Sequence, residues 1–274
     1  MGDMSIELPG AGASEDLFCQ YGASKLMCRG PSRKLDKPYI AFLGGSETFG
    51  KFVDKPFVAL VEQAVDKICV NLGSANSGLD AYVHDPEILR IAGGADLTVI
   101  QVMGAQNLSN RFYRVHPRRN DRFLAASALL QTIFRDVDFT EFHFNKHMLG
   151  ALKMASPEQF SIVQDELQQA WLARMRLLLG YLPRKPLLLW LRYGAEPSAP
   201  LGAEPVLVSR ATVDMLRPDI EGIIEVPVAC TGETDELGKM RFDPMQAPAA
   251  SHMIGPAMHR AIADQVSGVV RGIL

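Results

Sequence analysis

The chain has 274 residues, of which 47% are hydrophobic and 22% are charged, and its net charge is −3. This size gives one large domain or two small ones with an ample core. The slightly negative charge excludes the strongly basic composition typical of nucleic-acid-binding proteins, and no run approaches the ~18 apolar residues of a transmembrane helix. We therefore expect neither nucleic acid nor a membrane as a partner.

The N-terminus and the cysteines predict the compartment. Residues 1–16 are small, polar and acidic, and they lack the basic and apolar regions of a secretory signal. No C-x-x-C pair or metal-ligand spacing is present among Cys19, Cys28, Cys69 and Cys230. We expect a cytoplasmic protein that needs no metal and no cofactor.

Strands alternate with helices along most of the chain. Residues 1–37 form an irregular lead-in segment, and a single α/β domain is expected over residues 38–274. Five short apolar runs predict strands buried on both faces: Tyr39–Leu43, Ile68–Leu72, Leu97–Met103, Leu187–Leu191 and Gly222–Val226. Apolar residues at helical spacing predict helices over Pro56–Val65, Asp121–Phe134, Pro157–Leu179 and Met258–Ile273.

This alternation predicts three layers, α/β/α, around a parallel sheet of about five strands in flavodoxin-like order. The stretch from Asn107 to Arg184 contains no predicted strand. It is too long for one crossover, so we expect a helical insertion after the third strand.

A serine stands where the first strand ends. Ile40 to Leu43 lead directly into Gly44-Gly45-Ser46, which indicates a tight turn between a buried strand and a helix. In open α/β sheets, ligands bind at the carboxyl ends of the strands. Ser46 is therefore a candidate nucleophile or a hydroxyl that contacts a phosphate group.

Polar loops follow the other strands and should meet at the same edge of the sheet. The loop after strand two contains Gly73 and Asn76, the loop after strand three contains Gln106-Asn107, and His252 precedes the last helix. Histidine can take the proton of a serine hydroxyl near neutral pH. The N–H groups of Ser46 and Gly73, with the amide of Asn107 or Gln106, could stabilise an oxyanion.

This set resembles the SGNH, or GDSL-type, hydrolase superfamily, as a divergent branch. The resemblance rests on Ser46 and Gly50 for the first block, Gly73 for the second, Gly104 with Gln106-Asn107 for the third, and His252 for the last. It implies an SGNH hydrolase-like fold. It also implies a serine-dependent esterase or acylhydrolase with Ser46 and His252 as catalytic residues, and Ser46, Gly73 and Asn107 as the oxyanion site.

Two positions depart from the family pattern. Gly45 and Ala249 stand where the family has aspartates, so His252 would need another partner, such as Asp243 or a backbone carbonyl. An alternative is therefore a catalytically inactive SGNH-like protein that binds an anionic glycan or metabolite.

The same loop also matches part of a phosphate-binding P-loop. Gly45 and Gly50-Lys51 have the required spacing, but Phe52 replaces the Ser or Thr that would hold magnesium. A transferase that uses a phosphate- or sulfate-bearing donor is the remaining alternative.

An arginine-rich run follows strand three. Residues 111–122 include five arginines. The planar guanidinium group of arginine can donate two parallel hydrogen bonds to a carboxylate, sulfate or phosphate group. The substrate is therefore expected to be an anionic small molecule or an acylated carbohydrate, bound by Gly45, Gln106, Asn76, Arg111 and Arg114. Purely structural roles are the alternatives. Asn76 would then only form a turn, and the arginines would form salt bridges with Asp121, Asp136 and Asp138.

Overall fold

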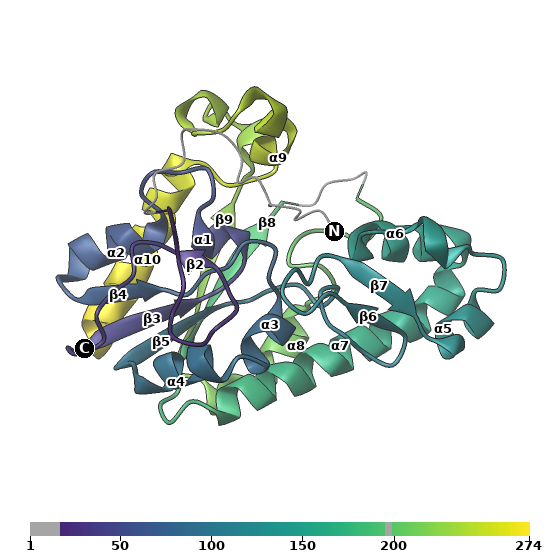
Figure 1. Cartoon of the computed structure of the whole chain (residues 1–274), viewed down its shortest axis with the longest axis horizontal. Coiled ribbons are helices and arrows are strands. Elements are labelled where there is room, and N and C mark those ends of the chain that lie inside the picture. The colour runs from purple at the N-terminus through teal and green to yellow at the C-terminus, as the bar shows by residue number, and fades with distance from the viewer. Residues whose placement is uncertain (1–16, 195–198) are drawn as a thin grey trace, which may run out of the picture.

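The computed structural model describes residues 17–194 and 199–274 (Figure 1). The part of the predicted lead-in that precedes residue 17 lies outside the described residues. Residues 17–37 contribute a short strand pair, and Tyr21, Leu26 and Cys28 belong to the hydrophobic core.

A five-stranded parallel sheet forms the centre of the molecule. Its strands stand in the spatial order β4-β3-β5-β8-β9. In chain order this is 2-1-3-4-5, the flavodoxin-like order, and all five predicted strands are confirmed. The strands are β3 (Tyr39–Leu43), β4 (Ile68–Asn71), β5 (Leu97–Gln101), β8 (Leu187–Tyr193) and β9 (Gly222–Val228).

Both faces of the sheet are covered. In β3, Ile40 and Phe42 pack into one hydrophobic cluster, and Ala41 and Leu43 pack into another on the opposite face. A strand buried on both sides has no need of polar residues, which explains its continuous apolar run. One face is covered by α2 (Phe57–Val65) and α10 (Pro256–Ile273). The other is covered mainly by α3 (Leu79–Val83), α4 (Pro86–Gly94), α7 (Pro157–Gly180) and α8 (Arg210–Asp214).

The insertion after β5 contains the expected helices, but the expectation that it contains no strand is wrong. It begins with an antiparallel pair, β6 (Tyr113–Val115) and β7 (Phe123–Ala126), and continues with α5 (Ala128–Ile133) and α6 (Asn145–Ala155). In β6 only the middle residue is exposed, and an alternation this short is hard to recognise.

The predicted helix over Asp121–Phe134 is correspondingly wrong in its first half. That half is β7. Ser127 then starts α5 by accepting the N–H of Leu130, as a helix N-cap does.

The remaining elements are short. They are β1 (Phe18–Cys19), β2 (Cys28–Arg29), α1 (Ser46–Phe49), α9 (Ala247–Ser251) and 3-10 turns at Phe139–Glu141, Arg217–Asp219, Thr231–Glu233, Leu237–Lys239 and Pro244–Gln246. Across residues 17–194 and 199–274, no helix is both long enough and apolar enough to cross a bilayer.

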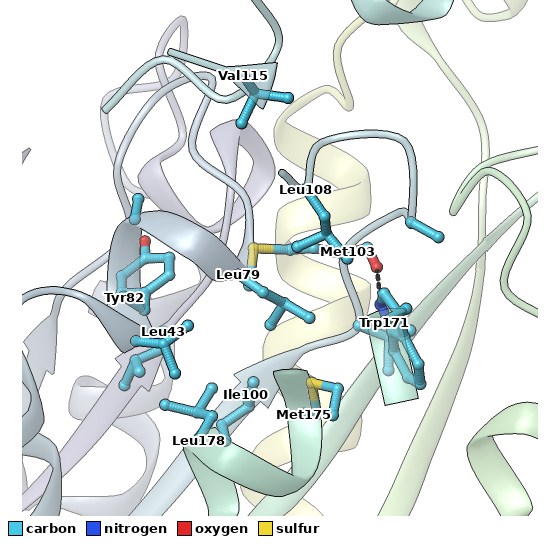
Figure 2. Packing of buried hydrophobic residues seen from close by; sticks show 14 of the residues in the cluster. Leu43, Leu79, Tyr82, Ile100, Met103, Leu108, Val115, Trp171, Met175 and Leu178 are labelled. Atoms are coloured by element: carbon cyan, nitrogen blue, oxygen red, sulfur yellow. Dashed lines mark hydrogen bonds between the residues drawn. The ribbon is translucent and has the colours of Figure 1, made fainter. Parts of the chain in front are cut away.

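Trp171 ties the long helix α7 to the segment leaving β5. Its side chain is fully buried, and its indole N–H donates a hydrogen bond of 2.7 Å to the carbonyl of Met103 (Figure 2). Leu43, Ile100 and Leu178 lie in the same core cluster. The hydrogen bond therefore fixes the path of the chain just beyond the third strand of the sheet.

Replacing Trp171 with Phe should lower the free energy of unfolding by about 2 kcal/mol more than the same change at Trp190. Both indoles are buried, but the Nε1 atom of Trp190 has no partner among the described residues, so only Trp171→Phe breaks a hydrogen bond. Urea denaturation of the two variants measures the difference. Equal losses would show that the bond to Met103 contributes nothing.

Candidate functional site

Ser46 follows β3, whose two neighbours in the sheet are β4 on one side and β5 on the other. The chain changes direction across the sheet at this point, so Ser46 lies at the topological switch point. Gly44 and Gly45 leave β3, and Ser46 begins the four-residue helix α1. A Cβ atom on Gly44 would lie 2.1 Å from Thr48 Oγ1 and 2.5 Å from Gln101 Oε1. The chain can therefore turn here only because residue 44 has no side chain.

Gln101, at the end of β5, holds α1 against the sheet. Its Oε1 accepts the N–H of Gly45 at 3.0 Å and the hydroxyl of Thr48 at 2.6 Å. Its Nε2 donates to Glu47 Oε2 at 2.8 Å, and the hydroxyl of Tyr193 donates to Glu47 Oε1 at 3.2 Å. Burial and the nearby Glu47 carboxylate raise the pKa of Tyr193 well above its usual value, so this phenol remains a donor.

Asn71, at the end of β4, completes the support of α1. Its Nδ2 donates to the carbonyl of Thr48 at 2.8 Å, and its Oδ1 accepts the N–H of Gly73 at 2.9 Å. A Cβ atom on Gly73 would lie 2.6 Å from the backbone nitrogen of Phe49. Gly73 is thus required for close packing, and its N–H, the expected oxyanion donor, is hydrogen-bonded within the protein.

The hydroxyl of Ser46 is held by the loop after β4. Ser46 Oγ accepts the N–H of Asn76 at 3.1 Å and donates a long hydrogen bond of 3.5 Å to Asn76 Oδ1. Asn76 has a φ of 60°, a left-handed conformation that asparagine tolerates in turns. The structure therefore brings together Gly45, Ser46 and Asn76.

His252 does not pair with Ser46. It is exposed at the C-terminal end of α9, and its imidazole makes no hydrogen bond with any residue that the structure describes. Asp243 is also exposed, and its N–H donates to Gln246 Oε1. Neither expected partner orients the imidazole of His252.

Three asparagines join the insertion to the sheet edge. Asn145 Nδ2 donates to Asn107 Oδ1 at 3.2 Å and to the carbonyl of Asn120 at 2.5 Å. The fully buried Asn120 accepts the N–H groups of Gly78 and Ala81 at 2.7 and 3.1 Å. Asn107 is thus tied to the insertion through its oxygen, and its Nδ2 group, the expected oxyanion donor, makes no hydrogen bond with Ser46 or any other described residue.

Gln106 is buried beside the end of β5. Its side chain folds back over Gly104, where an added Cβ would lie 2.1 Å from Gln106 Oε1. Among the described residues, Oε1 has no hydrogen-bond partner. No contact joins Gln106 to Ser46.

The arginine-rich segment contacts the loop after β4 through a main-chain carbonyl. Ser77 Oγ donates to the carbonyl of Arg118 at 3.2 Å, and the carbonyl of Ser77 would lie 3.5 Å from a Cβ on Gly45. The exposed residues Arg114, Arg118 and Arg119 form no ion pair with any described residue.

Arg111 differs from the other arginines because it is paired. Its Nε lies 2.7 Å from Glu166 Oε2, on α7. The expected pairs with Asp121, Asp136 and Asp138 do not form within the described part of the chain.

Part of the P-loop spacing is taken up by the turn of α1. Residues 46–49 coil into α1, where the N–H of Phe49 donates to the carbonyl of Gly45 and the N–H of Gly50 donates to that of Ser46. These amides are therefore occupied by the turn.

A small hollow opens beside Ser46. Its enclosed volume is about 10 Å³, and it lies between α1 with the residues after it and the segment that precedes α10. Its lining consists of Ser46, Glu47, Gly50, Lys51, Phe52, Val53, Met240, Met253, Ile254 and His259.

His259 is the buried histidine that lines this hollow. It is only 1% exposed, and its Nδ1 accepts the N–H of Phe57 at 3.0 Å. Desolvation, with a smaller contribution from Arg29, lowers the pKa of His259 from 6.5 to about 3. The imidazole is therefore neutral at physiological pH and carries its proton on Nε2.

The contacts that sequence reasoning missed lie mainly on polar residues inside apolar runs. Gln101 interrupts Val99–Met103, and Asn71 interrupts Ile68–Leu72. A polar residue in a doubly buried strand must find a partner, which is the signal that would have marked both.

The described residues contain no cluster of three or more His, Cys, Asp or Glu side chains that could hold a metal ion. His147, whose spacing from His143 suits a metal on a helix, packs against the ring of Phe142 at 5.1 Å.

The protein is therefore an α/β protein with a parallel five-stranded sheet, and Ser46 lies at the switch point on the carboxyl edge of that sheet. A family model described as a domain of unknown function, DUF6473, matches residues 4–274, and the chain belongs to that family. Comparison with the curated proteins gives no match.

Two neighbouring glycines should respond very differently to alanine. Gly44→Ala places a methyl group against Thr48 and Gln101 and should cost about 3 kcal/mol of stability. At Gly45 the nearest atoms are 3.4 and 3.5 Å away and φ is −80°, so Gly45→Ala should cost about 1 kcal/mol or less. Chemical denaturation measures both values, and equal losses would contradict the geometry of the turn.

His259 should make stability depend on pH. The unfolded chain binds a proton at this residue near pH 6.5, whereas the folded chain does so only near pH 3. Because the unfolded state binds more protons between these values, the free energy of unfolding should fall as the pH drops from 6.5 towards 3, by up to about 1.4 kcal/mol per unit.

Urea denaturation between pH 4.5 and 7.5 measures this slope. His259→Asn should flatten it, and the exposed His84→Asn should leave it unchanged. A wild-type slope that survives His259→Asn would assign the effect to other groups.

Proposed function

We propose that the carboxyl edge around Ser46 binds an anionic small molecule or acylated carbohydrate without hydrolysing it. The observation that carries this proposal is the state of the serine. Its Oγ accepts the N–H of Asn76 and donates to Asn76 Oδ1, a carboxamide oxygen that is not a base, and no histidine or carboxylate of the described residues is hydrogen-bonded to it. A serine hydroxyl without a base is a poor nucleophile but a good ligand contact.

The charges around the edge support an anionic ligand. Lys51 lines the hollow beside Ser46, and the main-chain carbonyl of Arg118 accepts the hydroxyl of Ser77, whose own carbonyl lies near Gly45. Lys51, Arg118 and Arg119 are exposed and form no ion pair with a described residue. The Glu47 carboxylate, in contrast, is engaged by Gln101 and Tyr193. The cations that remain available therefore favour carboxylate, sulfate or phosphate groups.

A serine-dependent ester hydrolase of the SGNH kind is the second candidate. Two observations favour it: the 2-1-3-4-5 strand order with Ser46 at the switch point, and the position of His252 directly before Met253, which lines the same hollow as Ser46. Hydrogen bonds between catalytic residues are often long in the absence of substrate. Hydrolysis would require the exposed imidazole of His252 to turn towards Ser46.

Binding should depend on the cations at this edge. Isothermal titration with phosphate, sulfate, glucuronate and O-acetylated glucuronate tests the expected ligand classes. Lys51→Ala should weaken the best of these ligands about fivefold or more, an effect on the order of 1 kcal/mol, and added salt should weaken binding further. Lys185→Ala, an exposed change just before β8 at the opposite edge of the sheet, is the matched control. Equal losses in both variants, or no binding of any of these anions, would contradict the proposal.

A fluorophosphonate probe separates the two candidates. The binding proposal predicts no covalent adduct at Ser46 by intact-mass measurement, and no turnover of short-chain chromogenic esters. An adduct that disappears in Ser46→Ala, with turnover that also disappears in His252→Ala, would establish the hydrolase instead.

A further inference from the structure

The turn that joins β6 to β7 concentrates positive charge on the surface of the insertion (Figure 1). Residues 116–122 include three arginines, one histidine and one carboxylate, in a chain whose net charge is −3. Arg118 and Arg119 are exposed, and neither forms an ion pair with any residue that the structure describes. Their guanidinium groups are therefore available to an anionic partner.

Hydrogen bonds hold this turn in one shape. The N–H of His116 donates to the carbonyl of Arg122 at 2.9 Å and closes the turn. His116 Nδ1 accepts the N–H groups of Arg118 and Arg119 at 3.3 and 3.1 Å. The fully buried Asn120 donates to the carbonyl of His116 at 2.9 Å and accepts two N–H groups at the start of α3. A turn fixed in this way loses little conformational entropy when a ligand binds to it.

The acidic residue of the turn does not cancel the charge of the arginines. Asp121 is half-buried and forms no ion pair with a described residue. Burial raises the pKa of its carboxyl, and the neighbouring Arg119 and Arg122 oppose that rise. The guanidinium of Arg122 lies over the ring of Phe144, 4.2 Å from its centre. One carboxylate therefore faces several cations, and the turn keeps a net positive charge.

The main chain of this turn lies close to Ser46. Ser46 Oγ accepts the N–H of Asn76, and the hydroxyl of the next residue, Ser77, donates to the carbonyl of Arg118. The covalent bonds between these two contacts place that carbonyl within about 15 Å of Ser46 Oγ. A ligand that contacts both places must be extended and must carry several charges, as a polymer of acidic sugars does.

The aromatic residues around the turn are poorly placed to stack on a nucleic-acid base. Phe112 and Tyr113 are each 1% exposed, and Arg122 covers one face of the Phe144 ring. Proteins that bind single-stranded nucleic acid stack the bases on accessible aromatic side chains. Arginines without such rings suit the carboxylate or sulfate groups of a sugar chain, to which they donate two parallel hydrogen bonds.

We propose that residues 116–122 are a docking surface for an acidic polysaccharide, one unit of which occupies the edge at Ser46. Arg118 and Arg119 bind the carboxylate or sulfate groups of neighbouring units. This inference rests on the proposed anion binding at Ser46 and names the partner, a chain rather than a single small molecule. The two contacts act together, because a ligand held at one of them has a high effective concentration at the other.

Isothermal titration of the full chain with galacturonate and with its linear oligomers tests the proposal. We expect the hexamer to bind about tenfold or more tightly than the monomer, and its binding to weaken more steeply with salt. Arg118→Ala/Arg119→Ala should weaken hexamer binding about tenfold and leave monomer binding unchanged. Arg176→Ala/Lys185→Ala removes the same charge from exposed positions on α7 and before β8, and it should change neither affinity.

Two further ligands define the chemistry of the partner. A sulfated oligosaccharide of the same length that binds more tightly, and that also depends on Arg118 and Arg119, would support the proposal and identify sulfate as the charged group. A single-stranded RNA of equal charge should bind more weakly than either sugar chain. Tighter binding of the RNA would overturn the assignment to a polysaccharide.

The outcomes distinguish this inference from the proposed function. If the monomer binds in a Lys51-dependent manner and the hexamer binds no more tightly, the edge binds anions and the polysaccharide surface is refuted. If the hexamer binds equally to wild type and Arg118→Ala/Arg119→Ala, the turn is not the contact. If the hexamer depends on the arginines but not on Lys51, the continuous path to Ser46 is refuted. If no ligand binds, both proposals fail. Should the arginine variant fail to fold, amide shifts of residues 116–122 in ¹⁵N-labelled wild type decide the question.

Discussion

The amide of Gln101 fixes the geometry of the candidate site. It stands at the end of a strand that is buried on both faces, where an unpaired amide would be costly. The hydrogen bonds of this amide go to three groups of the turn that follows β3: the N–H of Gly45, the carboxylate of Glu47 and the hydroxyl of Thr48. The helix that begins at Ser46 has only four residues, too few to be stable by itself. Its existence, and with it the position of Ser46, depends on this side chain.

The rest of the edge is built around that fixed turn. Asn76 reaches Ser46 Oγ from the loop after β4, and Ser77 in the same loop binds the carbonyl of Arg118. Asn120 caps the N-terminus of α3 from within the insertion, so the arginine-rich segment cannot move away from the sheet without leaving buried N–H groups unpaired. Hydrogen bonds therefore connect the switch point of the sheet to the main chain of the arginine-rich segment, about seventy residues further along the chain.

The sequence predicted the sheet well and the site only in part. Continuous apolar runs identified all five strands, and the polar residues after them placed Ser46 and Asn76 correctly at one edge. The β6–β7 pair was missed because each strand spans only three or four residues and the arginines dominate its pattern. Pairings such as Gln101 with Glu47 depend on the contact of residues 54 positions apart, which no local pattern reveals. The positions of Gly73, Asn107 and His252 in the chain suited a catalytic set. Their contacts do not assemble one: the N–H of Gly73 donates to Asn71, Asn107 is bonded through its oxygen to Asn145, and His252 faces solvent without a bond to Ser46.

Mapping of a bound anion onto the backbone amides tests the central claim most directly, namely that the switch-point edge is a binding site. The full chain, labelled with ¹⁵N, is titrated with the tightest-binding of the phosphate, sulfate and uronate ligands, and the shift of each amide resonance is measured. The account predicts that the largest shifts cluster at Ser46, Lys51 and Met253 and that residues around Lys185 do not respond. Shifts centred elsewhere, with Ser46 and Lys51 unaffected, would contradict it.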